Sequence, residues 1–444
     1  MAVAGATDFS QVPGDFKVRY ARKYKEVRGK ANIFSDLFKF EKQSLLGANF
    51  QIPIVLSYQG GANFTPAGDT NNYRPPVSAK IPFAIADNNE IVHILRLPFG
   101  VIAKASNGDD VSFATPEVLK MLTLTKSMAR DQEISFCHGL SGLGQASAVA
   151  YATPAAGQVT VTISAATWAP GLWSGVDGHP YQAVSALPGN AGTLRNDASG
   201  NNDYIFVSRS LTNKQLVFSG QGAAGTASAT ATSVQTSDFL FRSSAVASSA
   251  AAGTAGSITG TECAGIKFIC QQSALGGTLF NIPTTNTLWA AVQVAVGSAV
   301  LSTAVLYRTI AGLRDNGLED DVYAVTSTRS WSNVLSELQT QRDFDVSYSI
   351  SKLQTGTLAL ELASDGIKIN LVSHPYLMWG DSFVLPKNSF MRIGSSEPTM
   401  ELDGVELAVM SSNNSSIEFR MFSAQAIIPV ALGQVAYLSG IVPV

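Results

Sequence analysis

The chain has 444 residues, of which 45% are hydrophobic, and this is enough apolar material for a large core divided over two or three domains or subdomains. The formal net charge of −3 and the pI near 5.9 do not favour a sequence-specific nucleic-acid binder. Three cysteines without metal-knuckle spacing predict buried, reduced thiols, and the absence of a secretory pattern in residues 1–12 predicts synthesis and use in a cytosol.

Basic side chains dominate a short segment near the N-terminus. Residues 17–30 hold seven Lys or Arg and one Glu, a local charge of +6. Tyr20, Tyr24 and Val27 recur at helical spacing, which predicts a short basic amphipathic helix. This helix would lie on an acidic neighbour or near phosphates, and a merely solvated helix is the alternative.

Two extended arms follow, around a tip that is rich in Gly, Pro and Asn. The outgoing arm 50–58 and the returning arm 77–96 are rich in β-branched and aromatic residues. At about 3.3 Å per residue, such arms project roughly 50 Å. A two-stranded ribbon is marginal in water, so a surface outside the hairpin must cover it. The alternative is an edge hairpin that lies on its own domain.

A long helix is predicted next. Thr115, Pro116 and Glu117 have the order of an N-cap, a first-turn proline and an acid that matches the helix dipole. The apolar stripe that follows predicts a helix from Pro116 to about His138, where Gly139 ends it, with a length of about 35 Å.

The composition changes between residues 143 and 283, where only ten residues are charged. Strands are predicted at 158–164, 203–209, 214–219 and 239–241. The small-residue stretches 222–231 and 243–260 predict loops or weak strands, with disorder as the alternative. A packed β-rich insertion is the favoured interpretation because strand-like Phe239, Leu240 and Phe241 separate the two stretches.

Helical and strand patterns alternate in the last third of the chain. The uncharged stretch 288–307 has the length of a transmembrane span, but its Ala, Gln, Gly and Ser content favours a buried helix within 285–316. A strand at 322–325 and a helix at 330–342 are predicted after it. Further strands are predicted at 344–350, 356–362, 366–372, 382–385, 404–410, 417–422 and 427–430.

The search for chemistry yields no catalytic residue, no metal site and no cofactor site. The segment Gly139–Gly144 lacks the spacing of a nucleophile elbow and is interpreted as a helix-ending turn. The four histidines, at 93, 138, 179 and 374, show no ligand spacing and are interpreted as structural or surface residues. The acidic run 319–321 predicts a solvated loop or a partner for the basic arm, with a cation site as the alternative.

Three local patterns carry a family resemblance. They are Asp365–Ile369, the run His374–Leu385 with its Gly-Asp-aromatic-Val-Leu strand, and Asp321–Val325 followed by Ser330–Leu335. Together with the order of arm, long hairpin, long helix, mixed domain and terminal strands, they make the chain similar to tailed-bacteriophage major capsid proteins of the Hong Kong 97 type. The layout covers nearly the whole chain except the segment 143–283.

This resemblance implies an α+β, Hong Kong 97-like fold. Its expected parts are an N-terminal arm at 1–48, an extended loop at 49–105, a spine helix of the peripheral domain at 106–142, a β-rich insertion or enlarged peripheral or axial region at 143–283, an axial domain at 284–394 and a C-terminal β return at 395–444. The family's extended loop lies across an adjacent subunit, its arm reaches another, and its axial domains meet at hexamer and pentamer centres.

The resemblance also implies a structural function without enzyme activity. The expected product is an icosahedral shell around double-stranded DNA, assembled in the cytoplasm of a bacterial host. The expected partners are other copies of the chain, separate scaffold and portal proteins, a decoration protein and, without sequence preference, the packaged DNA; no membrane is expected. The alternatives are an encapsulin-like compartment and, from a different class, a β-rich tail or surface adhesin.

Overall fold

The computed structural model describes most of the chain. The described residues are 32–42, 49–61, 75–87, 89–99, 116–151, 158–197, 200–220, 234–251, 253–274, 276–341, 360–364, 366–400, 408–410 and 416–442. The basic segment 17–30, the small-residue stretch 222–231 and the expected strand 344–350 lie outside these ranges.

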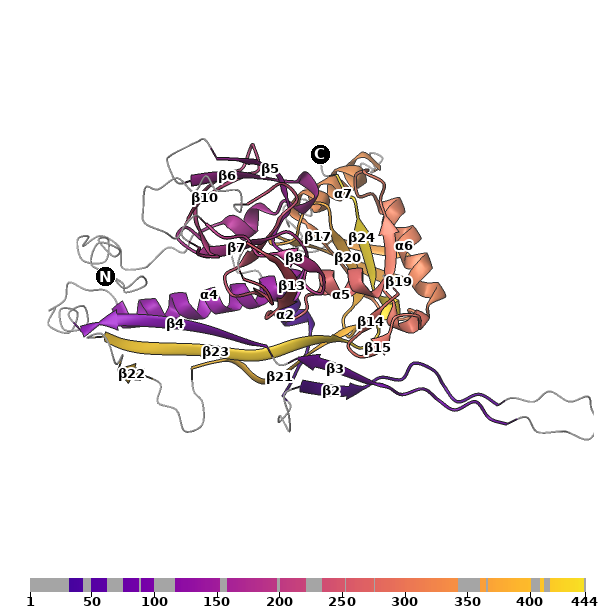
Figure 1. Cartoon of the computed structure of the whole chain (residues 1–444). Coiled ribbons are helices and arrows are strands. Elements are labelled where there is room, and N and C mark those ends of the chain that lie inside the picture. The colour runs from indigo at the N-terminus through magenta and orange to yellow at the C-terminus, as the bar shows by residue number, and fades with distance from the viewer. Residues whose placement is uncertain are drawn as a thin grey trace, which may run out of the picture.

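The long helix is present as predicted. Helix α4 spans Pro116–His138, and Figure 1 shows it lying along a sheet of long strands. Its end is a tight turn in which Leu140 and Gly142 have positive φ angles. Gly139 is required there because a Cβ atom would lie 2.1 Å from the carbonyl oxygen of Cys263.

The sheet beneath α4 is built around one long strand. Its strands are β1 (Phe40–Lys42), β4 (Glu90–Pro98), β21 (Phe390–Thr399), β22 (Ala408–Met410) and β23 (Ser416–Pro429). The expected strands 417–422 and 427–430 are therefore a single strand, which is a correction. The residues between them stay paired because Ala424 lies opposite Glu90 on one side and Ser396 on the other.

The hairpin projects away from the body (Figure 1). Strands β2 (Asn49–Pro53) and β3 (Phe83–Asp87) pair antiparallel, and isolated bridges continue the ladder outward to Gly60 and Val77. The interpretation of residues 77–96 as one returning arm was wrong, since β4 leaves the hairpin and pairs with β23. Exposed and half-buried residues alternate along most of β4, as expected for a strand with one face against the body and one face toward solvent.

The segment after α4 is a packed β-rich unit, as predicted. Its strands are β5 (Ala146–Ala150), β6 (Gln158–Ile163), β7 (Pro180–Val184), β8 (Ala191–Thr193), β9 (Tyr204–Ser210), β10 (Gln215–Gly220), β11 (Phe239–Arg242), β12 (Val246–Ser248) and β13 (Ala255–Gly260). Six of them form the sheet β11-β7-β9-β10-β6-β5, and β12-β13-β8 form another. Trp168, Trp173 and Phe206 are among the side chains buried against the larger sheet.

A second mixed sheet has the order β16-β24-β20-β17-β19-β18. Its strands are β16 (Val292–Ala295), β17 (Val322–Ser327), β18 (Leu360–Ser364), β19 (Ile367–His374), β20 (Ser382–Pro386) and β24 (Ala436–Ser439), and helices α6 (Thr303–Asp315) and α7 (Thr328–Gln341) pack on it. The strands expected at 322–325, 366–372 and 382–385 and the helix expected at 330–342 are confirmed.

The helix expected over 285–316 was wrong in its first half. Residues 292–295 form β16, paired parallel with β24, and the helix begins only after Ser302, whose hydroxyl accepts a hydrogen bond from Val305 N. Half-buried Val292 and Val294 alternate with exposed residues, which is the two-residue period of a strand, and Gly297 has a left-handed φ of 74° that interrupts a helix. No described helix is long and apolar enough to cross a membrane.

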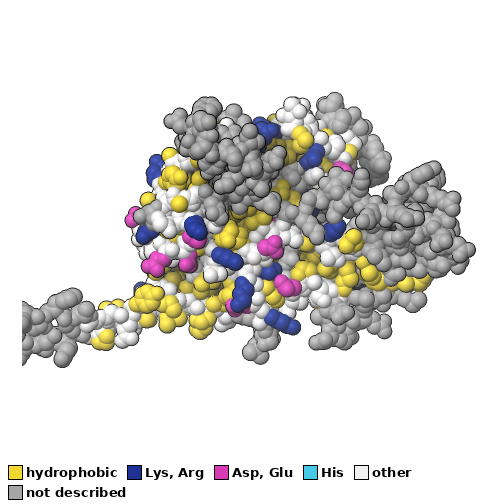
Figure 2. Space-filling view, turned by 180° about the vertical axis from the view of Figure 1, so that it is seen from behind, with side chains coloured by type: hydrophobic (Ala, Val, Ile, Leu, Met, Phe, Trp, Pro, Cys, Tyr) yellow, Lys and Arg dark blue, Asp and Glu magenta, His cyan; other side chains and the backbone are white. Residues whose placement is uncertain are grey.

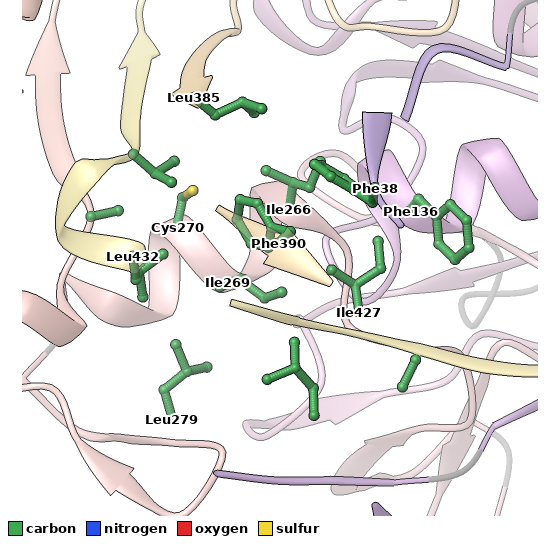
Figure 3. Packing of buried hydrophobic residues seen from close by; sticks show 14 of the residues in the cluster. Phe38, Phe136, Ile266, Ile269, Cys270, Leu279, Leu385, Phe390, Ile427 and Leu432 are labelled. Atoms are coloured by element: carbon green, nitrogen blue, oxygen red, sulfur yellow. The ribbon is translucent and has the colours of Figure 1, made fainter. Parts of the chain in front are cut away.

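A central core joins these layers. Helix α5 (Ile266–Ser273), which the sequence did not predict, lies beside the small hairpin β14 (Thr278–Leu279) and β15 (Ile282–Pro283). Figure 3 shows Phe38, the C-cap of the short helix α2 (Ile33–Leu37), together with Phe136 of α4, Phe390 of β21 and Ile427 of β23, gathered around α5. Ile266, Ile269 and Cys270 are fully buried there, so segments from both ends of the chain share one core. Short 3₁₀ helices at Ala165–Thr167, Pro170–Trp173, Thr287–Trp289 and Leu432–Gln434 complete the structure.

Candidate functional site

The hairpin has one covered face and one exposed face. Phe50 and Ile52 of β2 and Ala84 of β3 are buried in the central core. The opposite face carries Val55, Ile81 and Phe83, which are 50%, 52% and 53% exposed, and we call these three residues the outer apolar row. Contiguous exposed apolar side chains of this kind mark surfaces that another molecule covers.

Among the described residues, backbone hydrogen bonds join the hairpin to the body only near its base, although Ile54 and Leu56 further out still pack in the central core. Ile85 N donates to Phe280 O at 3.0 Å, and outward of this bond the described arms hydrogen bond only to each other. Tyr58 and Val77, further out, are 86% and 67% exposed. In Figure 2 hydrophobic side chains cover the described part of the hairpin where it leaves the body. A paired ribbon this exposed needs an external surface for stability.

The strand that continues from the hairpin also has an unpaired edge. Strand β4 pairs with β23 along one edge, and no described residue pairs with its other edge. Val92 and Ile94 are 50% and 52% exposed on the face of β4 that points away from α4. On the opposite face, His93 Nε2 lies 3.3 Å from Asp131 Oδ2 of α4.

A cleft of about 610 Å³ opens beside β4. One wall is the run Glu90–Ile94 of β4, the floor is the middle of α4, and the other wall comes from the insertion around His179–Tyr181 and Arg242–Ala245. The cleft therefore separates the root of the hairpin from the β-rich insertion.

Asp131 of the floor helix α4 links both walls of this cleft. Arg242 Nη1 of β11 lies 3.6 Å from Asp131 Oδ1 and donates to the Asp131 backbone oxygen at 2.8 Å. Arg242 also pairs with Glu262 and Ser135. Burial opposes ionisation of Asp131, but the hydrogen bond from His93 and the charge of Arg242 outweigh it and hold its pKa at about 2. The carboxylate is therefore charged at all ordinary pH values.

A second junction lies on the other side of α4. The carboxylate of Glu133, which is fully buried, accepts hydrogen bonds from Phe34 N at 2.6 Å and from Ser35 N and Oγ at 3.0 and 2.7 Å. His374 Nε2 lies 3.1 Å from Glu133 Oε1, and His374 Nδ1 accepts from Tyr376 N. Since Nδ1 is an acceptor, Nε2 carries the proton and donates to Glu133. Glu133 thus joins α2, α4 and the end of β19.

A buried ion pair lies close to this junction in the fold. Lys267 Nζ of α5 is 2.7 Å from Asp381 Oδ2, and Tyr437 OH donates to Asp381 Oδ1 at 2.8 Å. Burial and the neighbouring carboxylate raise the pKa of Tyr437. Burial and the charge of Lys267 lower the pKa of His138 to about 3, so this imidazole is neutral, and its Nε2 donates to Tyr376 O at 2.8 Å. The shifted pKa values keep Tyr437 and His138 neutral, which suits a rigid support.

The chemistry candidates from the sequence occupy structural positions. Ser141 in the turn Gly139–Gly144 is buried and donates to His138 O at 2.8 Å, so it is a turn residue as interpreted. Asp321 Oδ1 accepts from Lys368 N at 3.0 Å, and residues 319–321 are exposed. Within the described ranges no three His, Cys, Asp or Glu side chains are placed to hold a metal ion. The three cysteines are free and buried, as predicted.

Comparison with protein-family models finds no match, and comparison with curated protein sequences finds none either. Among solved structures, the chain is similar to one in the capsid asymmetric unit of cyanophage A-1(L), with 11% identity, 96% of each chain covered and a TM-score of 0.53. It also aligns with a chain from the capsid of a native GTA particle (8% identity, 98% and 99% covered, TM-score 0.47) and with one from Mycobacterium phage Bobi (8% identity, 97% and 98% covered, TM-score 0.43).

The likeness to the cyanophage chain shows that this chain has the fold of a phage capsid protein over nearly its full length. The α+β, Hong Kong 97-like fold expected from the sequence is therefore confirmed.

Proposed function

We propose that this chain is a major capsid protein that self-assembles through hexamers and pentamers into an icosahedral shell around the double-stranded DNA of a tailed bacteriophage. The observation that carries this proposal is the hairpin, which projects from a complete core with the outer apolar row uncovered. The full-length likeness to a phage capsid chain supports the same conclusion.

The geometry favours contacts between different surfaces of neighbouring copies. One face of the hairpin is already buried in the central core, whereas the outer apolar row lies on the face that the body leaves uncovered, so a different surface of a neighbouring copy would cover it. Such a head-to-tail contact closes into rings when the rotation between copies permits, and rings of six and five build a closed shell. Burial between copies then adds stability that one chain lacks.

The parts of the chain are assigned on this basis. We assign residues 1–48 to the arm, 49–105 to the extended loop, 106–142 to the spine helix, 143–283 to the insertion, 284–394 to the axial domain and 395–444 to the C-terminal return. The function is structural rather than enzymatic. The proposed place is the virion, after assembly in a bacterial cytoplasm with separate scaffold and portal proteins, and the proposed contacts with DNA are to phosphates. A decoration protein is a further proposed partner.

Electron microscopy of the purified, recombinantly expressed full chain, with size-exclusion chromatography alongside, tests this function. We expect closed shells or capsomer rings. A folded monomer at high concentration, with and without a coexpressed scaffold protein, would contradict the proposal. An enzyme cargo in place of nucleic acid inside the shells would favour the encapsulin-like alternative.

A further inference from the structure

Four side-chain oxygens of the insertion are buried without a hydrogen-bond partner among the described residues. They are Gln182 Oε1, Asn196 Oδ1, Asn202 Oδ1 and Asp203 Oδ1. Buried polar atoms in folded proteins are nearly always paired, so a group of unpaired acceptors in one region indicates a bound donor or a bound cation. A cation can contact several oxygens at once, which a single N–H or O–H group cannot do.

The pairing of β7 brings these residues to one place. The segments before and after the loop 196–203 pair with the same edge of β7. The segment before the loop pairs with residues 183–184, and the segment after it pairs with residues 180–181. Gln182 lies between these two contacts, so both ends of the loop lie beside it.

The loop itself holds Asn196 and Asn202 close together. Asp197 N donates to Asn201 O at 2.8 Å, and Asp197 Oδ1 accepts from Asn201 N at 2.9 Å. Asn196 and Asn202 are the residues directly outside this closed pair. Both amides therefore lie at the neck of the loop, where it meets β7.

Gln182 and Asn196 share one face of the sheet. Phe241, the partner of Gln182 in β11, is buried in a small apolar cluster with Val184 and Leu194. Residues opposite each other in an antiparallel pair share a face, and so do residues two apart in a strand. The Gln182 side chain belongs to a residue that is only 7% exposed, so its unpaired oxygen is withdrawn from bulk water.

Asp203 adds a negative charge to these amides. Its neighbour Tyr204 is buried in the larger core on the opposite face, so the alternation of an extended chain places the Asp203 side chain on the face of the unpaired amides. Asp203 Oδ2 accepts from Ser243 Oγ at 2.9 Å, while Oδ1 is unpaired. Arg195 and Arg242 of the neighbouring segments pair with other acids. A withdrawn carboxylate beside further acceptors is stabilised by a bound cation.

We propose that Gln182, Asn196, Asn202 and Asp203 form a calcium site that fastens the loop 196–203 to β7. Ca²⁺ takes about six to eight oxygen ligands in flexible geometry, including amide, carboxylate and water oxygens, whereas Mg²⁺ requires a stricter octahedron. The three loop residues are half-buried, so the ion can enter from solvent and keep water ligands. With a single carboxylate, the expected dissociation constant is about 0.1–1 mM. The site goes beyond the proposed function and does not depend on shell formation.

Thermal unfolding of the full chain, stripped with EDTA, tests the site. We expect CaCl₂ at about 10 mM to raise the Tm by at least about 3 °C, and MgCl₂ at the same concentration to raise it less. Calorimetric titration with CaCl₂ should give one site per chain. An unchanged Tm and no calorimetric binding would overturn the site and would show that water or amide NH₂ groups satisfy these oxygens. Equal effects of the two salts would overturn the assignment to calcium.

Asp203→Asn separates ion binding from a merely structural role. This change removes the charge and puts an NH₂ group, a donor, beside the unpaired amide oxygens. We expect the variant to keep at least the wild-type Tm in EDTA and to lose the response to CaCl₂. Asp177→Asn, at an exposed position of the same insertion, is the matched control and should respond like wild type. A full calcium response in Asp203→Asn, or its loss in Asp177→Asn as well, would contradict the proposed ligands.

Discussion

Asp131 and Glu133 lie two residues apart on α4, and their side chains point to different sides of the helix. Asp131 contacts His93 at the root of the hairpin and Arg242 of the insertion. The Glu133 carboxylate accepts hydrogen bonds from backbone N–H groups of α2 and from the ring of His374. One turn of this helix therefore fixes the positions of the hairpin, the insertion, the N-terminal segment and the mixed sheet.

The low pKa of Asp131 predicts a dependence of stability on pH. Its pKa in the folded chain, about 2, lies below the ordinary aspartate value of 3.8, so its contribution to stability is fully present above about pH 4 and is lost as the pH falls through about 2. The difference corresponds to about 2 kcal/mol. We expect Asp131→Asn to lower the free energy of unfolding at pH 6, and the gap from wild type to shrink by about 1 kcal/mol at pH 3. Urea unfolding at both pH values measures this, and a gap independent of pH would contradict it.

Glu133→Gln should destabilise the chain by about 2–4 kcal/mol, because an NH₂ group replaces one acceptor in a fully buried site with four donors. Glu337→Gln is the matched control. Glu337 accepts from Thr303 N and Oγ1 in a similar two-point contact, but it is only partly buried and both partners lie in one region of the fold. Its cost should stay near about 1 kcal/mol. If chemical unfolding shows the same loss of unfolding free energy for Glu133→Gln and Glu337→Gln, Glu133 has no special role in joining the parts of the fold.

These residue-level junctions could not be predicted from the sequence. Glu133 lies 99 residues from Phe34 and 241 from His374, and no local pattern marks the three as partners. The sequence did predict that His138 and His374 are structural, because neither had ligand spacing. What it lacked was the packing that brings α2 and the end of β19 to one buried carboxylate.

At the scale of elements, local signals succeeded where they were strong. Thr115, Pro116 and Glu117 marked the start of α4, and Gly139 marked its end. The error at residues 285–316 has a physical cause: Ala and Val suit both a buried helix and a buried strand, and only pairing with β24 decides between them. Pairing also explains why residues 90–98 leave the hairpin, since β23 offers a nine-residue partner.

The hairpin supplies the prediction that belongs to this scale. Phe83→Asp places a charge in the outer apolar row, and the row is exposed in the single chain, so we expect the monomer to keep its Tm. Assembly should fall at least about tenfold because the charge would be desolvated at the contact. Val207→Asp, at an exposed apolar position of β9, is the control and should assemble normally. Equal sedimentation profiles for the two variants would show that the row is not a contact surface.

At the scale of the whole molecule, the order of arm, hairpin, long helix and mixed sheet was sufficient to predict the fold, which the likeness to the cyanophage capsid chain confirms. The local sequence patterns were enough to predict this order of elements, although the chain is only 11% identical to the cyanophage capsid chain. The same patterns could not reveal that α5 belongs to the central core, because its eight residues depend on packing against α2, α4 and β21 rather than on their own periodicity.

The central claim is that copies of this chain cover one another's hairpins. Cryo-electron microscopy of the assembled particle, at a resolution that traces the backbone, tests it most directly. We predict continuous density for residues 49–87 lying across an adjacent copy, with the outer apolar row buried at that contact. Particles in which the hairpin extends into solvent or folds back on its own body would contradict the account.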